Sequence, residues 1–332
     1  MTRSMLFASV LTLATAAGAH AADPSGYKVI GHISASDGGF DYLTFDSTNH
    51  RVLVGRGTGV TVIDVANVSS KLLAGPNVHE GLSVNGGKEI LTTDGAAGAV
   101  HILDGQTGAN IATIPTGRNP DAAAIDPRSG LVMVMNHSGG DVSLIDVKAR
   151  ANVGTITIGG TLEAAVADGA GKAYVNVEDK NEVVAIDLNA KTVLGHYPMA
   201  GCTGPTGITM AVPEKLLLVA CGGAVAVVKS DTGVLVKTIK IGNGADGIVY
   251  DATRHLAFVP AGRDGNLSVL EVKGQEVNLI DTVPTMVGAR TITIDPASGR
   301  LYLCASKVGP PPAGGGRATT LPGSYEVLVV GK

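Results

Sequence analysis

The sequence has no tryptophan, few other aromatic residues and few charges. Aromatic residues make up 3% of its 332 residues, charged residues make up 16%, and the formal net charge is −4 at pH 7. Proteins that bind nucleic acids usually carry a basic surface, and many stack bases on aromatic side chains. The sequence has no basic run and little aromatic content, so we do not expect nucleic acid as a partner.

Long apolar runs are also scarce, and the one candidate lies at the N-terminus. Arg3 precedes an apolar run over residues 5–17, and the small-x-small triplet Ala19-His20-Ala21 follows it. This order is typical of a cleaved signal peptide, whereas a membrane-spanning helix needs about 20 apolar residues. We therefore expect residues 1–21 to be a signal peptide, the mature chain to begin at Ala22 and the protein to be periplasmic or secreted. The alternative is retention as a membrane anchor, and no membrane span is expected after cleavage.

Glycine and short β-branched runs are abundant. The 46 glycines fall between runs rich in Val and Ile, which is typical of an all-β chain with many turns. The stretch from Asn119 to Gly159 shows this most clearly, because turn-forming residues separate four runs: AAAID (122–126), LVMVM (131–135), VSLID (142–146) and VGTITI (153–158). Four strands in a repeat of about forty residues are typical of a β-propeller blade.

The same unit recurs along the whole chain. The residue that closes its first run appears at Asp46, Asn85, Asp126, Asp168, Ala211, Asp251 and Asp295. These seven units predict an all-β fold, a seven-bladed β-propeller with four-stranded antiparallel blades, in a single domain over residues 22–332. The last unit ends after its third run, and an extra run from Tyr27 to Ile33 precedes the first. We expect this N-terminal strand to complete the last blade and close the ring.

A Pro- and Gly-rich stretch from Lys307 to Gly323 interrupts the last unit. Its composition predicts a surface loop. Two interpretations remain open, a neutral insertion and a flap over one end of the central channel.

Several units resemble the YVTN-type β-propeller repeat, and the whole mature chain resembles the exported, single-domain bacterial members of that family. The matching segments are Asn119-Pro120, Ile125-Asp126-Pro127, Val142 to Asp146, Ala173 to Asn176, Ile294 to Pro296 and Leu301 to Leu303. The resemblance implies a seven-bladed propeller. It implies no single activity, since propellers serve both as enzymes and as binding modules.

Carboxylates recur at one position of the repeat, five residues before each closing residue. We call these seven residues the mouth column: Asp41, Glu80, Asp121, Glu163, Thr206, Asp246 and Arg290. Because the first strand of each blade lines the channel, the column should gather at one mouth. Each acid could simply fix a turn by accepting backbone N–H groups. Carboxylates gathered at one mouth repel each other, however, unless a cation, a basic ligand, raised pKa values or Arg290 compensates for their charge.

The second strands should end at the same mouth because they run antiparallel to the first. They add Asn136, His137, Asn176 and Glu178. Oxygen donors predominate, which favours Ca²⁺ or Mg²⁺ as a possible cofactor over zinc. The predicted ligand-binding set is therefore Asp41, Glu80, Asp121, Asn136, Glu163, Asn176, Glu178, Asp246 and Arg290. Its candidate metal ligands are Glu80, Asp121, Glu163 and Asp246.

Two segments of the column suggest one kind of chemistry. His79-Glu80-Gly81 and Ala245-Asp246-Gly247 are similar to the strand-entry ligands of gluconolactonase-like propellers. That similarity implies a divalent metal at the mouth that polarises a lactone or ester. His79 and His137 would then be candidate acids or bases.

The three cysteines can be assigned from the repeat. Cys202 lies just before the first strand of the fifth unit and Cys221 ends its second strand, so antiparallel pairing brings both to one end. In an exported protein this predicts a disulfide. Cys304 lies within an apolar run and should be a buried free thiol.

These observations leave three functional hypotheses for a chain that we expect to be a monomer. The first is a recognition module that binds a small molecule, a cation or a protein partner at the acidic mouth. The second is a divalent-metal-dependent hydrolase or lyase with the metal at the same mouth. The third is a purely structural repeat protein of the cell envelope. The absence of tryptophan argues against quinone-dependent dehydrogenase propellers, and no Gly-x-Ser-x-Gly motif is present.

Overall fold

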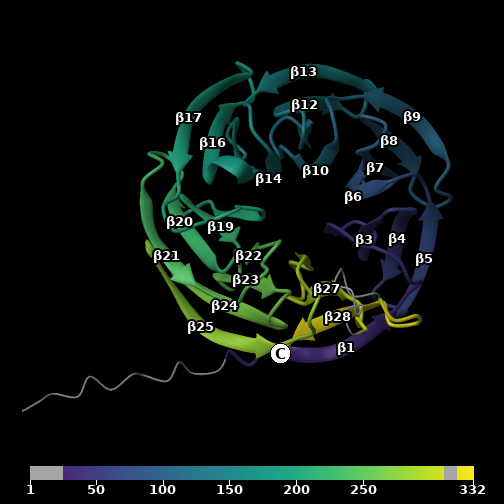
Figure 1. Cartoon of the computed structure of the whole chain (residues 1–332). Helices are drawn as coiled ribbons and strands as arrows, with labels where there is room; N and C mark the ends of the chain where they lie inside the picture. The colour runs from purple at the N-terminus through teal and green to yellow at the C-terminus, as the bar shows by residue number, and fades with distance from the viewer. Residues whose placement is uncertain (1–24, 310–319) are drawn as a thin grey trace, which may run out of the picture.

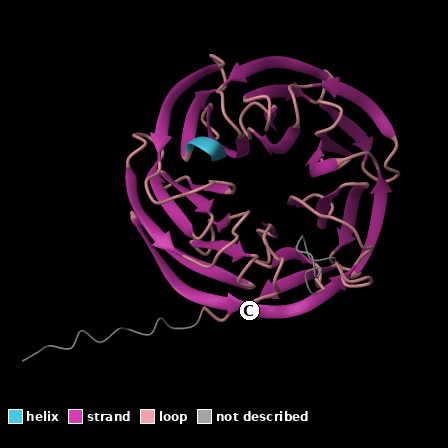
Figure 2. Cartoon of the chain, viewed as in Figure 1, coloured by secondary structure: helices cyan, strands magenta, loops and turns pink. Residues whose placement is uncertain are grey.

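A computed structural model describes residues 25–309 and 320–332. The expected signal peptide, residues 1–21, lies outside the described residues, as does the middle of the Lys307 to Gly323 loop. The described chain forms seven four-stranded antiparallel sheets arranged as blades in a ring (Figure 1). Strands and connecting loops make up nearly all of it, apart from a short 3₁₀ helix, η1 (Glu178–Lys180) (Figure 2). The predicted all-β, seven-bladed propeller is confirmed.

The first three blades follow one another in the chain. Blade 1 comprises β2 (Leu43–Asp46), β3 (Arg51–Arg56), β4 (Gly59–Asp64) and β5 (Ser69–Ala74). Blade 2 comprises β6 (Val78–Val84), β7 (Glu89–Asp94), β8 (Ala99–Asp104) and β9 (Asn110–Pro115). Blade 3 comprises β10 (Pro120–Ile125), β11 (Val132–Asn136), β12 (Asp141–Asp146) and β13 (Ala151–Thr157).

Blades 4 to 6 repeat this order. Blade 4 comprises β14 (Leu162–Ala167), β15 (Lys172–Val177), β16 (Glu182–Asp187) and β17 (Thr192–Pro198). Blade 5 comprises β18 (Ile208–Ala211), β19 (Leu216–Cys221), β20 (Ala224–Lys229) and β21 (Leu235–Lys240). Blade 6 comprises β22 (Val249–Asp251), β23 (Leu256–Ala261), β24 (Asn266–Lys273) and β25 (Glu276–Pro284).

Blade 7 joins the two ends of the chain. It comprises β26 (Ile292–Ile294), β27 (Leu301–Ala305), β28 (Glu326–Gly331) and β1 (Lys28–Ser34) in the order β1-β28-β27-β26. Strand β1 pairs antiparallel with β28 from Lys28 opposite Gly331 to Ser34 opposite Glu326. The predicted closure by the N-terminal strand agrees with this pairing.

Aspartates that end the inner strands form the turns to the second strands. Oδ1 of Asp46 accepts hydrogen bonds from the backbone N–H groups of Thr48 and Asn49. Asp251 does the same for the two residues Thr253 and Arg254. Such local bonds favour a tight turn over continuation of the strand, so the chain reverses at each of these residues.

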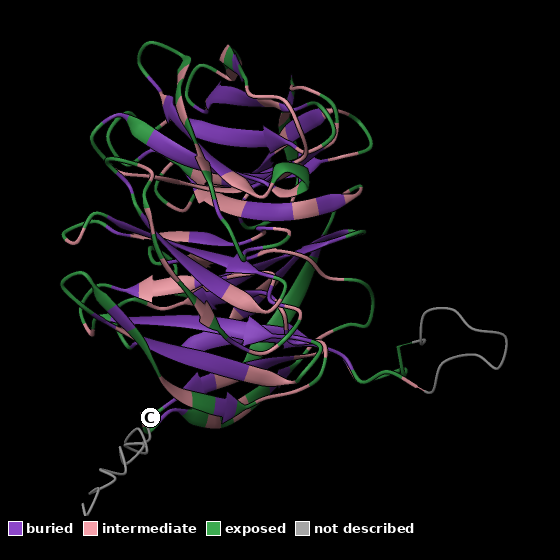
Figure 3. Cartoon of the chain, turned by 60° about the vertical axis from the view of Figure 1, so that its left-hand side comes forward, coloured by how far each residue is buried: buried purple, intermediate pink, exposed green. Residues whose placement is uncertain are grey.

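The hydrophobic core lies between neighbouring blades. One cluster, for example, joins Leu144 of blade 3 to Leu162 and Val175 of blade 4, and all three side chains are fully buried. Figure 3 shows buried residues concentrated in the inner strands of each blade and exposed residues on the outer strands and loops. Each blade therefore depends on its neighbours for burial of its apolar faces.

The three cysteines are arranged as predicted. Cys202 and Cys221 form a disulfide with a Cα–Cα distance of 5.4 Å, and both are buried. Cys304 is a buried free thiol. Nowhere in the described chain is there a helix with the length and apolarity needed to cross a membrane.

Candidate functional site

The mouth column lies where the inner strands of the blades begin. Contacts among its members and the neighbouring His79 connect blade 6 to blades 7, 1, 2 and 3. Nε of Arg290 donates to Oδ2 of Asp246 at 2.7 Å, and Nη2 lies 3.8 Å from Oδ1 of Asp41. Nδ1 of His79 then lies 2.9 Å from Oδ2 of Asp41 and 3.1 Å from Oδ1 of Asp121. The structure thus brings these predicted residues together at one end of the ring.

Tyr42 completes the network, and sequence reasoning missed it. Its hydroxyl donates to Oε2 of Glu163 at 3.0 Å and lies 3.5 Å from Oδ2 of Asp121. Tyr42 belongs to blade 1 but packs against the apolar cluster of blades 3 and 4, so its side chain reaches across the axis. A signal was available in the sequence, because the residues that follow the other six column positions are all small: Gly81, Ala122, Ala164, Gly207, Gly247 and Thr291.

His137 pairs with the next member of the column. Its Nδ1 lies 3.2 Å from Oε1 of Glu163 and 3.0 Å from the carbonyl oxygen of Leu162. A carbonyl oxygen only accepts hydrogen bonds, so Nδ1 of His137 carries a proton. The bond to Glu163 outweighs burial and raises the pKa of His137 to about 9.

Glu80 does not join this network. It is buried, and its Oε2 accepts the backbone N–H of Ala123 in blade 3 at 2.5 Å. Burial raises the pKa of the Glu80 carboxyl to about 8. By accepting this backbone N–H, Glu80 has a structural role like the one that we considered for the column. The bond joins blade 2 to a strand of blade 3, however, and does not fix a turn.

Burial and charge pairing together reduce the repulsion expected at the mouth. Burial, together with the negative charge of Asp41, raises the pKa of Asp121 to about 7. Burial also raises the pKa of Asp246, and Arg290 offsets only part of this rise. The pKa of His79 is raised chiefly by its bond to Asp41. Arg290 and His79 thus lie among the carboxylates of the mouth, which offers both hydrogen-bond donors and acceptors.

The residues predicted from the second strands lie close by. Nδ2 of Asn136 donates to Asp141 and Ser143 of the same blade, whereas Nδ2 of Asn176 donates to the carbonyl oxygen of Thr206 in blade 5. Both asparagines are fully buried, and neither Oδ1 has a hydrogen-bond partner among the described residues. Glu178 begins η1, and its pKa is raised by burial and then by the charge of Glu163.

Two groups of mouth residues have the composition and spacing of metal ligands. Within each group the ligand atoms lie within 4.8 Å of one another, and the groups are Asp41, His79 and Asp121, and Asp121, His137 and Glu163. Of the four metal ligands suggested by the sequence, Asp121 and Glu163 belong to these groups. Glu80 is bonded to Ala123 and Asp246 to Arg290 instead. The structure therefore places imidazoles where the sequence suggested carboxylates alone.

A cavity of about 320 Å³ opens at the mouth between blades 6 and 7. It is lined by Gly244, Ala245, Asp246, Gly262, Arg263, Gly288 and Arg290. Backbone hydrogen bonds join its glycines, since the N–H of Gly262 donates to the carbonyl oxygen of Gly244 and the N–H of Gly288 donates to that of Gly262. The Asp246–Arg290 pair supplies both charges, so a polar ligand in this cavity could contact the ion pair.

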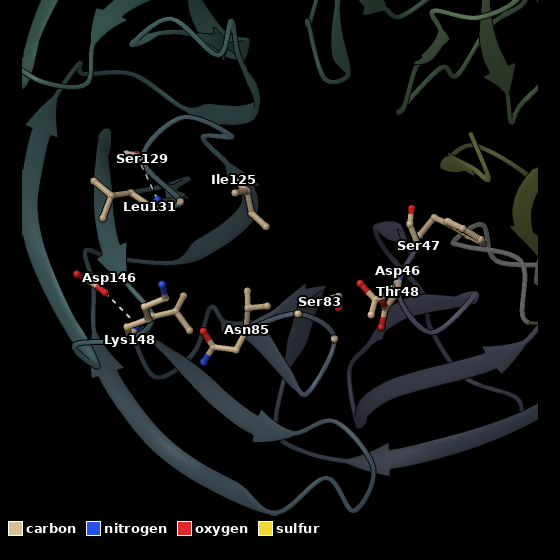
Figure 4. A pocket seen from close by; sticks show the side chains of 16 residues that line it. Asp46, Ser47, Thr48, Ser83, Asn85, Ile125, Ser129, Leu131, Asp146 and Lys148 are labelled. Carbon is tan, nitrogen blue, oxygen red and sulfur yellow. Dashed lines mark hydrogen bonds between the residues drawn. The ribbon is translucent and has the colours of Figure 1, made fainter. Parts of the chain in front are cut away.

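A larger cavity of about 520 Å³ lies at the opposite ends of the inner strands, over blades 1 to 3 (Figure 4). Asp46, Ser83 and Ile125 line it near the axis, and Lys148 lies on its outer side. Sequence reasoning did not find this cavity, because its lining comes from turns of three different blades.

The fold and the charged mouth define the class of this molecule, a seven-bladed β-propeller. No family model matches the chain, and no curated protein matches it. A chain in the crystal structure of the mitotic checkpoint complex is similar at 16% identity and a TM-score of 0.70, over 92% of this chain and 96% of that one. Hydrazine synthase of Kuenenia stuttgartiensis is similar at 12% identity and a TM-score of 0.68, over 82% and 94%. Identities this low show the fold alone.

Proposed function

We propose that the protein is an exported β-propeller recognition module that binds a polar ligand, such as a peptide segment of a partner protein, at the charged mouth. The observation that carries this proposal is the half-exposed, alternating charge of the mouth. The side chains of Arg290, Asp41 and His79 are 38%, 31% and 30% exposed. They are therefore accessible to a ligand while their contacts hold them in place.

The chemistry of the mouth favours a ligand that has both donors and acceptors. Arg290 and His79 offer N–H groups, and Asp41 and Asp246 offer carboxylate oxygens. A peptide segment with mixed side chains matches such a surface, because it carries both charges as well as hydrogen-bond donors and acceptors. Propellers commonly serve as scaffolds for protein interactions, which agrees with this choice.

An array of immobilised short peptides of defined sequence tests the proposal. The mature chain should bind a subset of the array, and fluorescence anisotropy should give the affinity of each hit. Arg290→Gln and Asp246→Asn should weaken binding at least about tenfold, since each breaks the charged pair. Lys148→Gln, at the opposite end of the ring, is the matched control and should bind as the unmodified protein does. Equal binding by all variants would place the interaction elsewhere.

We also propose that the protein is periplasmic or secreted and begins at Ala22 after cleavage. The disulfide between Cys202 and Cys221 supports export, because disulfides persist in oxidising compartments. Intact-mass measurement of protein recovered from the periplasmic fraction of a bacterial host should give the mass of a chain starting at Ala22. Recovery of a chain that retains residues 1–21 in the membrane fraction would contradict it.

A metal-dependent hydrolase at the same mouth is the second candidate. The specific observation in its favour is that His137 and Glu163 lie beside Asp121 with Tyr42 donating to Glu163. A metal ion there could polarise a lactone carbonyl, and His137 could transfer a proton. A pH-indicator assay with a panel of sugar lactones, run after EDTA treatment and after return of Ca²⁺, Mg²⁺ or Zn²⁺, tests it. No metal-dependent acid release would reject this candidate.

A further inference from the structure

We propose that Asp41, His79 and Asp121 form a binding site for a divalent transition-metal ion at the mouth, with Zn²⁺ or Co²⁺ favoured over Ca²⁺ and Mg²⁺. The inference rests on the proposed function, because it places the ion at the end of the ring where ligands bind. It changes both the ligand set and the type of metal from those that the sequence suggested. The evidence is the position of one imidazole nitrogen between two carboxylates from different blades.

Nδ1 of His79 lies within hydrogen-bond distance of Oδ2 of Asp41 and of Oδ1 of Asp121 at the same time. A single N–H group points well at only one acceptor, so one carboxylate is always poorly satisfied. A divalent ion in place of that proton would be bonded by all three atoms. It would also balance the two carboxylate charges with a neutral imidazole.

The donor set selects the kind of metal. Imidazole nitrogen is a ligand of Zn²⁺ and its neighbours in the first transition row, whereas Ca²⁺ takes six to eight oxygen ligands and Mg²⁺ keeps several waters. One nitrogen and two carboxylates leave further coordination positions open. Asp41 and His79 are half-exposed, so a bound ion could be reached by a ligand from solvent.

Backbone hydrogen bonds hold the three ligand-bearing segments in place before any ion binds. The N–H of Tyr42, next to Asp41, donates to the carbonyl oxygen of His79 at 3.2 Å. The N–H of Glu80, next to His79, donates to Oγ1 of Thr93, which in turn donates to the carbonyl oxygen of Asp121. The ligands are therefore linked across blades 1, 2 and 3, and little ordering is needed on binding.

Two glycines, Gly55 and Gly95, make room for His79 at this site. A Cβ atom on Gly55 would overlap the carbonyl oxygen of His79, so the close approach of blades 1 and 2 here requires glycine. A Cβ atom on Gly95 would lie 2.8 Å from Nε2 of His79 and closer still to Oδ1 of Asn119. Gly95 thus leaves the room that the His79 ring occupies.

The neighbouring group around His137 differs in one decisive respect. Nδ1 of His137 donates to the carbonyl oxygen of Leu162, so that nitrogen keeps its proton and cannot ligate a metal ion. Nδ1 of His79 has only carboxylates as partners. Nδ1 of His79 is therefore open to a metal ion between two carboxylates, whereas Nδ1 of His137 is not.

Metal titrations of the EDTA-stripped mature chain test the site with metal ions alone as probes. Isothermal titration should show one Zn²⁺ or Co²⁺ per chain, bound at least about tenfold more tightly than Ca²⁺, and bound Co²⁺ should give a visible absorption band. His79→Gln and Asp41→Asn should each weaken Co²⁺ binding at least about tenfold, and Gly95→Ala should weaken it while all three ligands remain, because the added methyl group would displace the His79 ring. His196→Gln is the control, because His196 pairs with Glu182 on the outer strand β17, and it should bind as the unmodified chain does. Circular dichroism melts identify any variant that does not fold, and the remaining variants then decide the result.

Three results would overturn the proposal: no binding of Co²⁺ or Zn²⁺, equal affinity for Ca²⁺, or an equal loss in His196→Gln. These outcomes are independent of peptide binding, which is measured separately with the Arg290 and Asp246 variants. Failure of the metal site therefore leaves the recognition function testable, and the reverse also holds.

Discussion

Val68 is a β-branched residue in a left-handed backbone conformation, with a φ of 51°. It lies in the turn after the third strand of blade 1. The equivalent positions in blades 2 and 5 are Gly108 and Gly233, both with positive φ. Its side chain is 61% exposed, so it gains little from burial. A side chain in this conformation costs about 1–2 kcal/mol, and glycine removes that cost but increases the backbone entropy lost on folding. Val68→Gly should therefore raise the free energy of unfolding by about 0.5–1 kcal/mol.

Urea denaturation of the Val68→Gly variant measures this change. Val153→Gly is the control, because Val153 is also exposed but lies within an outer strand with ordinary backbone angles. That substitution should destabilise the protein. A loss of stability in both variants would show that Val68 is not strained.

Glu80 should make stability depend on pH. Its pKa is raised to about 8 in the folded protein from 4.5, so the unfolded chain loses its proton at lower pH than the folded chain does. The folded state is therefore increasingly disfavoured as pH rises from about 4.5 to 8. Glu80→Gln keeps an oxygen for the N–H of Ala123 and removes the titration. Its free energy of unfolding should equal that of the unmodified protein near pH 4 and exceed it by about 2–4 kcal/mol at pH 9.

Thermal melts across this pH range measure the effect. The surface substitution Glu276→Gln serves as the control, because that side chain is 75% exposed. It should leave the pH profile unchanged. A Glu80→Gln profile parallel to that of the unmodified protein would contradict the assigned role of burial.

Strand β1 should be essential to blade 7. It covers the edge of β28, and both Tyr27, just before the strand, and Ile33, within it, are buried, at 6% and 3% exposed. Deleting residues 22–34 leaves a sheet edge unpaired and removes about 1.5–3 kcal/mol of apolar burial for each of the two side chains. We expect a clear fall in the melting temperature and earlier proteolysis within β28. An unchanged melting temperature would argue against closure by β1.

The disulfide should stabilise the start of blade 5. It closes a loop with a sequence separation of 19, for which loop entropy predicts a contribution of about 3 kcal/mol. A Cys202→Ser, Cys221→Ser double variant should therefore unfold at a lower urea concentration. Reduction of the unmodified protein with dithiothreitol should give a similar shift, and Cys304→Ser should not abolish that shift.

The ring as a whole should unfold as one unit, because each apolar cluster is shared by adjacent blades. Leu144 of blade 3 is fully buried against Leu162 and Val175 of blade 4. Leu144→Ala should cost about 2–5 kcal/mol and lower the melting temperature of the entire molecule in a single transition. Circular dichroism and tyrosine fluorescence should report the same midpoint. Two separate midpoints would show that the blades unfold independently.

The sequence by itself determined the architecture of the molecule. Strands β11 and β12 begin and end within one residue of the apolar runs LVMVM and VSLID, and the bond between Cys202 and Cys221 follows from the antiparallel register. These features could be predicted because strand formation and turns depend on residues close together in the chain. Recurrence of the unit then placed the mouth column at one end of the ring.

Only the tertiary structure decided what the column residues contact. Tyr42 crosses from blade 1 to Glu163, His79 lies between two carboxylates, and Glu80 turns to Ala123. The shortest of these contacts, from Asp41 to His79, spans 38 positions in sequence. Such pairings depend on how far each side chain extends over a neighbouring blade and on the space that residues such as Gly95 leave. Repeat spacing carries none of that information, because it fixes where a residue lies along its strand but not which of several nearby partners its side chain reaches.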